Sequence, residues 1–417
     1  MKKLDDFRLS FGNKELIPII VGGMGTDIST TKMAIECARL GGICHISDSI
    51  CNAVVDRHYK TNFVENRYNQ YKNFVSQSDK SEEKFAIDEV QNAVNLLVSK
   101  TMEQKKGDGE IYINIMEKLS MNNSSTTLKA RLNASLDAGI DGISLSAGLH
   151  LKSFAMLEDN PRFRHARLGI LVSSQRALKI FLLKTKRLRR LPDFIVVEGP
   201  LAGGHLGFRM DDLNKINLKS IVLDVVSFLK KEQLDIPVVP AGGLFTGSDA
   251  VEMMEIGASA VQVATRFAVT KESGLPDKVK LEYFKANQED IEVNMVSPAG
   301  YPMRMLKNSP CLGSGIRPNC ERLGYLLDNH GGCSYIDAYN AASKVKGERL
   351  RVDEKTCLCS HMQLYNTWTC GQTTHRLKDT TNRLENGNYQ ILTTEHVFND
   401  YLHSSNQEIC LPSLEEK

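Results

Sequence analysis

The stretch from Phe194 to Phe208 reads FIVVEGPLAGGHLGF and decides how the rest of the chain is interpreted. It opens with four apolar residues, a run typical of a parallel strand that is covered on both faces. The run stops at a loop in which glycines surround one histidine, His205. Because these glycines carry no Cβ, a flat ligand can approach the backbone closely. The pattern predicts an α/β enzyme with its chemistry at the carboxyl end of the strands.

The alternative is that His205 is an ordinary surface residue or a hydrogen-bonded core residue, and that the glycines only turn the chain. We favour a catalytic His205 because the histidine and the glycine cluster coincide at the end of a predicted strand.

Short apolar segments alternate with helical patterns along most of the chain. The eight predicted strands are Ile17–Val21, Ile43–Ile46, Ile111–Ile115, Gly142–Leu145, Leu168–Val172, Phe194–Glu198, Ile236–Pro240 and Ala260–Val263. The predicted helices are Met33–Leu40, Leu128–Ala138, Gln175–Lys184, Leu218–Lys231 and Ser248–Ile256. In the last of these, Ser248 is the expected N-cap and Gly257 lies just past the end. This alternation predicts an α/β fold of the (β/α)8 TIM barrel type, although a doubly wound sheet would show it too.

Two parts of the chain lie outside this repeat. Residues 52–108 are polar and charged, with helical spacing in Tyr59–Phe74 and Phe85–Leu97, and we expect a helical insertion there. We expect the barrel to occupy residues 1–304 and a C-terminal extension, residues 305–417, to pack on the barrel face as a lid or dimer contact. Helical patterns in the extension are Tyr335–Lys344, Arg376–Leu384 and Glu395–Leu402.

Charge and composition narrow the class of partner. The chain has 417 residues, with 52 Lys and Arg against 50 Asp and Glu, which gives a formal charge of +2. This balance favours neither nucleic acid nor a membrane surface, and a small molecule is the expected partner. The apolar run at Ile17–Val21 is too short for a signal peptide or a membrane span, so we expect a soluble, cytoplasmic protein.

The chain contains ten cysteines, and no secretory signal accompanies them, so we expect reduced thiols or metal binding rather than a disulfide framework. Cys37, Cys44 and Cys51 have the pattern of small core residues. Six others gather after residue 304, with His361 and His375 near some of them. Their spacing is irregular and lacks a CxxC pair, so we predict no metal site and expect mostly buried, reduced thiols. These six are Cys311, Cys320, Cys333, Cys357, Cys359 and Cys370.

The loops after the last two predicted strands, Ala241–Gly247 and Gln262–Phe267, have the composition of a phosphate site. TIM barrels commonly bind phosphate there. The phosphate would accept hydrogen bonds from backbone N–H groups that the glycines leave exposed, and from the helix N-terminus after Gly247. The Thr265 hydroxyl and the Arg266 cation would supply the remaining contacts. Alternatively, the glycines only turn the chain and Arg266 pairs with a neighbouring acid. The chain has no GxxxxGK[ST] motif, so a monophosphate on a planar cofactor fits better than a nucleoside triphosphate.

Five motifs, in this order, resemble the nitronate monooxygenase family, formerly called 2-nitropropane dioxygenases. The resemblance implies a TIM barrel that binds FMN non-covalently, with its reactive ring nitrogen facing the substrate. The motifs are PIIVGGMG (18–25), EGPLAGGHLG (198–207), VVPAGGLFTG (238–247), VQVATRF (261–267) and SPAGYPMR (297–304).

Site residues follow from this resemblance position by position. His205 matches the family histidine that acts as a base towards the substrate carbon. The implied cofactor-binding residues are Gly23, Met24, Asn114, Glu198, Gly203, Gly204, Gly242, Gly243, Gln262, Val263, Ala264 and Thr265.

The chain also departs from the family pattern. Glu198 stands where these enzymes usually carry Gln, Ala264 where they usually carry Gly, and Pro200-Leu201 replaces the usual loop residues. Glu198 and the AGGH motif resemble a sister group, the flavin-dependent enoyl-acyl-carrier-protein reductases. The resemblance to the nitronate monooxygenases implies oxidation of alkyl nitronates with O2 to a carbonyl compound and nitrite, and we expect this activity. The alternative is reduction of an enoyl thioester by NAD(P)H through FMN. A binding protein without catalysis is a third possibility, and a homodimer is compatible with each.

Overall fold

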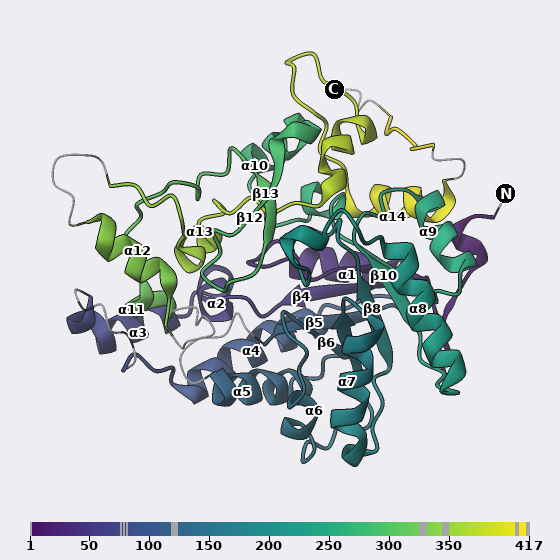
Figure 1. Ribbon diagram of the computed structural model, residues 1–417, viewed down its shortest axis with the longest axis horizontal. Helices are drawn as coiled ribbons and strands as arrows, with labels where there is room; N and C mark the ends of the chain where they lie inside the picture. Colours follow the sequence, from purple (N-terminus) through teal and green to yellow (C-terminus); the bar gives the residue numbers. More distant parts are fainter. Residues whose placement is uncertain are drawn as a thin grey trace.

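The computed structural model describes residues 2–75, 77, 80, 82–117, 124–324, 332–343, 350–404 and 408–413. Its centre is a closed barrel of eight parallel strands in the order β10-β11-β3-β4-β5-β6-β7-β8, which confirms the predicted TIM barrel (Figure 1). The strands are β3 (Ile19–Val21), β4 (Ile43–Ser47), β5 (Glu110–Met116), β6 (Gly142–Ser146), β7 (Arg167–Val172), β8 (Phe194–Glu198), β10 (Val238–Ala241) and β11 (Val261–Val263).

Apolar side chains fill the inside of the barrel. Tyr112 of β5 and Phe194 of β8 stack at 5.5 Å between ring centroids. A short hairpin of β1 (Leu9–Phe11) and β2 (Lys14–Leu16) adds Phe11, whose ring lies 6.3 Å from that of Phe194. These residues share one apolar cluster with buried residues from several other strands, so the barrel is a packed core and not a pore.

The predicted helices surround the barrel. They are α1 (Thr31–Arg39), α5 (Ser124–Asp137), α7 (Gln175–Thr185), α8 (Leu218–Lys231) and α9 (Gly247–Glu255). The short α6 (Ser153–Met156), between β6 and β7 in the chain, was not predicted. The predicted N-cap of α9 was wrong. Thr246, not Ser248, caps the helix, because its hydroxyl accepts a hydrogen bond from the N–H of Asp249. Gly257 does follow the helix, with a φ of +104° that favours glycine.

The insertion is helical as expected, but its first helix lies before the predicted segment Tyr59–Phe74, which forms only the second. α2 (Cys51–Tyr59) ends at Lys60, which adopts a left-handed φ of +57°, and α3 (Phe63–Tyr71) begins three residues later. The break is stabilised by Asp56, whose carboxylate accepts hydrogen bonds from the N–H groups of Phe63 and Val64. α4 (Ile87–Met102) then leads back to the barrel.

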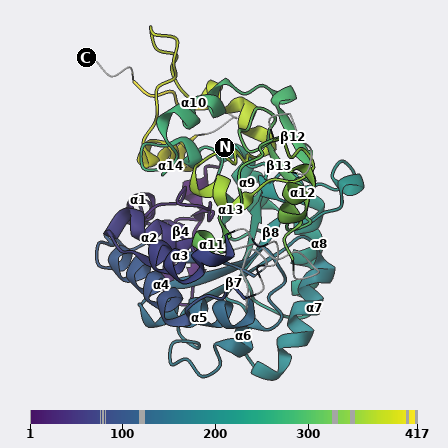
Figure 2. The same ribbon diagram turned by 90° about the vertical axis from the view of Figure 1, so that its left-hand side faces the viewer.

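The C-terminal part of the chain crosses the end of the barrel at which the strands finish, drawn in green and yellow in Figures 1 and 2. A three-stranded antiparallel sheet joins it to the His205 loop. α14 contacts α1 and α9 on the side of the barrel. The elements are β9 (Gly204–His205), α10 (Asp277–Lys285), β12 (Ile291–Asn294), β13 (Met303–Leu306), α11 (Cys320–Leu323), α12 (Ser334–Ala342), α13 (Leu358–Gln363), η7 (Gln372–Thr380) and α14 (Thr394–His403).

Two predicted helices of this part need correction. The pattern at Arg376–Leu384 belongs to the 3-10 helix η7, which begins earlier and ends at Thr380. The helix predicted at Tyr335–Lys344 is α12, and Lys344 itself lies outside the described residues. Over the part of the chain that the structure describes, no helix combines the length and the apolarity that a membrane crossing requires.

Candidate active site

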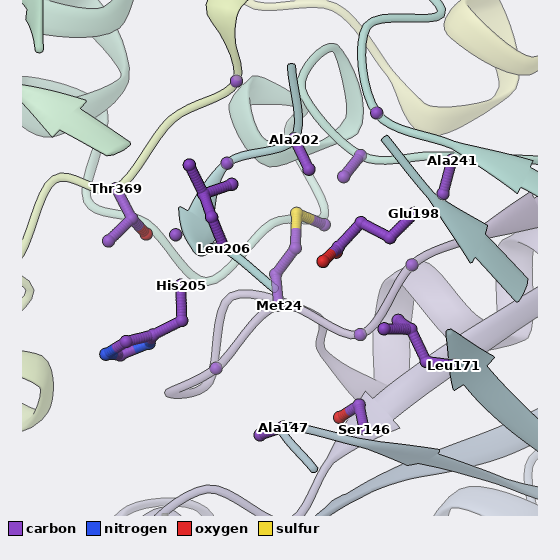
Figure 3. Close-up of a pocket in the computed structure, with 18 of the residues that line it drawn as sticks. Met24, Ser146, Ala147, Leu171, Glu198, Ala202, His205, Leu206, Ala241 and Thr369 are labelled. Carbon is purple, nitrogen blue, oxygen red and sulfur yellow. The ribbon is translucent and has the colours of Figure 1, made fainter. Parts of the chain in front are cut away.

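One cavity of about 450 Å³ lies at the carboxyl ends of the barrel strands. All thirteen residues that the family resemblance implied for catalysis or cofactor binding line it, including His205, Glu198 and Asn114. Figure 3 shows the Glu198 and His205 side chains in this cavity, Glu198 from the end of β8 and His205 from β9. The fold therefore brings together residues that are up to 242 positions apart in the chain.

The glycines among them are required by close packing. A Cβ at Gly23 would stand 2.3 Å from the Cβ of Asn114, so only glycine fits between β3 and β5. Gly242 and Gly243 follow β10 with φ values of +95° and +92°, which side chains rarely adopt. In the described part of the chain, the N–H groups of Gly243, Leu244 and Thr265 donate no hydrogen bond to the protein. This surface suits a flat ligand whose phosphate accepts from backbone N–H groups.

Arg266 is not a phosphate ligand, so that prediction was wrong and the alternative interpretation was right. The side chain is only 1% exposed, and its Nη1 lies 2.6 Å from the carboxylate of Asp400 on α14. The N-terminus of α9 is not available to bind a phosphate either. The Asp249 carboxylate accepts from the N–H groups of Phe245 and Thr246, and a Cβ at Gly247 would meet the Tyr401 carbonyl at 2.5 Å.

His205 is held at the edge of the cavity by two kinds of contact. Its backbone pairs with Met303 of β13, and its Nε2 lies 2.6 Å from the Ser297 hydroxyl oxygen. Burial lowers the pKa of His205 to about 4. The imidazole is therefore neutral near pH 7 and offers one acceptor nitrogen and one N–H donor.

Glu198 is the carboxyl group of the cavity. Burial raises its pKa to about 7, and no hydrogen-bond or ion-pair partner accompanies it among the described residues. At neutral pH the group is thus divided between a carboxylic acid, which can donate a hydrogen bond, and a carboxylate, which cannot.

The loop between Glu198 and His205 is held in place by hydrogen bonds from Arg304. Arg304 is buried, and its Nη1 donates to the carbonyl oxygens of Pro200 and Ala202 at 2.7 and 2.6 Å. Arg304 ends the SPAGYPMR motif, so the motif acts here by holding the Pro200–Ala202 backbone.

The C-terminal extension supplies part of the cavity wall, and sequence reasoning did not find these residues. A Cβ at Gly203 would stand 2.6 Å from the Cys370 carbonyl carbon, and one at Gly371 would stand 2.8 Å from the Thr265 hydroxyl oxygen. A segment without regular periodicity gives no signal of such contacts. The wall residues from this part are Leu358, Met362, Thr367, Thr369, Cys370, Gly371 and Thr374.

The cysteines are free thiols in the structure. Cys37, Cys44 and Cys51 are buried core residues as predicted. In the C-terminal part, Cys311, Cys320, Cys357 and Cys370 are buried and Cys333 and Cys359 are half-buried. The described residues contain no group of three or more His, Cys, Asp or Glu that could hold a metal ion.

Comparisons with known proteins agree with the barrel fold. Over 114 residues the chain is 38% identical to a (3aS,4S,5R,7aS)-5-hydroxy-7a-methyl-1-oxo-octahydro-1H-indene-4-carboxyl-CoA dehydrogenase of Rhodococcus jostii. Over 120 residues it is 32% identical to a probable nitronate monooxygenase of Staphylococcus saprophyticus. These matches cover 27% and 28% of this chain, and only 29% and 32% of the two relatives.

Two solved structures share the fold over most of their length. FabK from Thermotoga maritima has a TM-score of 0.54 at 18% identity, with 92% of this chain and 91% of FabK covered. Nitroalkane oxidase from Streptomyces ansochromogenes has a TM-score of 0.55 at 16% identity, with 92% and 94% covered. The family model described as nitronate monooxygenase matches residues 13–314, which is most of the chain and includes every predicted site residue. The chain therefore belongs to the nitronate monooxygenase family of flavin-dependent oxidoreductases.

Proposed function

We propose that this protein binds FMN non-covalently and oxidises alkyl nitronates with O2 to a carbonyl compound and nitrite. The observation that carries the proposal is the position of His205, at the edge of a glycine-lined cavity in a chain of this family. FMN, when bound, supplies the electron-accepting and oxygen-activating chemistry.

The cavity offers suitable groups for each part of that cofactor. Gly243 and Thr265 have backbone N–H groups that would bind the phosphate. Gly23 and Asn114 would border the flat ring where no Cβ intrudes. The full set of residues proposed to hold FMN is Gly23, Met24, Asn114, Glu198, Gly203, Gly204, Gly242, Gly243, Gln262, Val263, Ala264 and Thr265.

His205 would position the reacting carbon of the nitronate, and it would accept the α-proton only where the substrate is the neutral nitroalkane. Because burial holds the pKa of His205 at about 4, the imidazole is a weak base. A weak base removes the α-proton of a nitroalkane slowly, which favours a substrate already in the nitronate form. The hydrogen bond to Ser297 fixes the ring orientation.

Glu198 would act on the cofactor rather than on the substrate. In its protonated form the carboxyl group can donate a hydrogen bond to the bound ring, as the amide of the usual family Gln can. In its ionised form it would repel a nitronate anion, so we expect turnover to be highest below the pKa of about 7.

A second candidate is reduction of an enoyl thioester by NAD(P)H through the same cofactor. Glu198 favours it, because this residue departs from the family Gln. The 38% identical relative is named as a dehydrogenase of a CoA thioester, which supports an acyl thioester as an alternative substrate.

The proposal is tested by measuring bound FMN in the purified protein, and nitrite release with O2 uptake on adding an alkyl nitronate. Stoichiometric FMN with nitronate-dependent nitrite is the expected result. Bound FMN without nitrite formation would reject the monooxygenase reaction and leave the reductase.

A further inference from the structure

One side of the cavity is an apolar surface next to His205. Met303, Leu358 and Met362 all line the cavity and belong to one apolar cluster, and we call these three residues the apolar wall. Met303 is the backbone partner of His205 in the β9–β13 pair, so the wall begins beside the imidazole. Leu358 and Met362 stand one helical turn apart on α13, which places both on one face of that helix.

The residues that line the cavity carry almost no charged side chains. Among the described residues that line it there is no lysine, arginine or aspartate, and the only carboxyl group is Glu198. Arg304 follows Met303 in β13, but its guanidinium is bound to the carbonyl oxygens of Pro200 and Ala202. A carboxylate on the substrate tail would therefore lose its hydration here without gaining a cationic partner.

We propose that the apolar wall binds the uncharged alkyl chain of the substrate, and that the site discriminates against substrates with a charged tail such as propionate 3-nitronate. This inference rests on the proposed function for the identity of the reacting group. It adds the tail that the site accepts and assigns Met362 as the wall residue that contacts the tail, because Met303 and Leu358 are only 0% and 1% exposed and support Met362 from within the cluster.

Each methylene buried against the apolar wall should improve binding about two- to fourfold, the usual effect of removing one methylene from water. The first experiment compares kcat/KM for the nitronates of nitroethane, 1-nitrobutane and 1-nitrohexane with that for propionate 3-nitronate. We expect kcat/KM to rise along the alkyl series, through a falling KM at similar kcat, and to be lowest for propionate 3-nitronate. A flat series, or a preference for propionate 3-nitronate, would overturn the inference and leave the proposed function standing.

A charge introduced into the wall should reverse this preference. In Met362→Lys, the new ammonium would pair with a carboxylate tail, so the ratio of kcat/KM for propionate 3-nitronate to that for hexyl nitronate should rise at least tenfold. The matched control is Met295→Lys, because Met295 is 43% exposed and is not among the cavity-lining residues. An unchanged ratio in Met362→Lys with normal FMN content would remove Met362 from the specificity site. If Met362→Lys loses FMN, Met362→Gln keeps the side-chain length and should flatten the alkyl series.

A binding measurement separates this inference from the reaction. Isothermal titration calorimetry of the wild type compares 1-nitrohexane with 3-nitropropionate, neither of which has to be turned over. Tighter binding of 1-nitrohexane by at least tenfold supports the apolar site even if no nitronate is oxidised, in which case only the proposed function fails. Equal or tighter binding of 3-nitropropionate contradicts the inference whatever the reaction is.

Discussion

The Nε2 atom of His205 lies 2.6 Å from the hydroxyl oxygen of Ser297, although 92 residues separate the two in the chain. Ser297 Oγ also accepts a hydrogen bond from the N–H of Ala299, and its second lone pair can accept one from the imidazole. When Nε2 carries the ring proton and donates it to Ser297, Nδ1 is the free acceptor that can take a proton from a substrate. The pair thus fixes the orientation of His205, the one imidazole among the described residues that line the cavity.

His205→Ala should keep FMN and lose most turnover. Removal of a positioned acid-base group typically lowers the rate about 10²- to 10⁴-fold. The measurement is kcat/KM for an alkyl nitronate together with the flavin absorbance spectrum. Ser297→Ala, which keeps the imidazole but frees its orientation, should lower kcat by a smaller factor, about tenfold. Wild-type turnover in His205→Ala would remove this residue from the mechanism.

Glu198→Gln should change how stability depends on pH. Burial raises the pKa of Glu198 from 4.5 to about 7, so between these values the folded protein holds a proton that the unfolded chain releases. Wild-type stability therefore falls as pH rises from about 4.5 to 7 and stays lower above pH 7. Glutamine does not titrate, so the melting temperature of Glu198→Gln relative to wild type should rise by about 1–3 °C between pH 5 and pH 8. Glu232→Gln, at an exposed position, is the control, and parallel melting profiles for wild type and Glu198→Gln would refute the assignment.

Gly23→Ala should prevent cofactor binding. The new methyl group would stand 2.3 Å from the Asn114 Cβ, which cannot move without shifting strand β5. We expect loss of most bound FMN, measured as the ratio of flavin to protein absorbance. Gly332→Ala is the matched control, because a Cβ there would meet no atom of the described residues within 4 Å. Full FMN content in Gly23→Ala would show that the cofactor does not use this side of the cavity.

Arg266→Met should destabilise the fold through α14. It leaves the Asp400 carboxylate buried without its partner, which typically costs about 3–5 kcal/mol of the free energy of unfolding. Denaturant unfolding measures the loss. Lys219→Met breaks an ion pair of the same 2.6 Å length whose side chains are about half exposed, and it should cost about 1 kcal/mol or less. Equal losses in the two variants would mean that the buried pair does not hold the C-terminal helix.

The barrel could be predicted from the sequence because its signals are local. Each strand is a short apolar run, five of the eight predicted runs are followed directly by glycine or serine, and the predicted segment Phe194–Glu198 coincides with β8. Helix caps were less certain, since Thr246 and Ser248 are both good N-cap residues. What selects Thr246 is its hydrogen bond to the N–H of Asp249, whose carboxylate bonds back to the Thr246 N–H.

The strand-end half of the site was predictable for the same reason, whereas the half supplied by the extension was not. Glycine loops after strands mark Gly203 and Gly242 without any knowledge of tertiary contacts, and Gly23 was found through the family resemblance. The sequence could not decide whether Arg266 meets a phosphate or a carboxylate, because its partner Asp400 is 134 residues away. Leu358 and Met362 likewise reach the cavity only through the path of the C-terminal chain.

The most direct test of the central claim is anaerobic addition of an alkyl nitronate, and separately of NADH, to the purified flavoprotein. We predict that hexyl nitronate bleaches the flavin absorbance and that NADH leaves it unchanged. Bleaching by NADH alone would contradict nitronate oxidation and assign the site to reduction of an enoyl thioester.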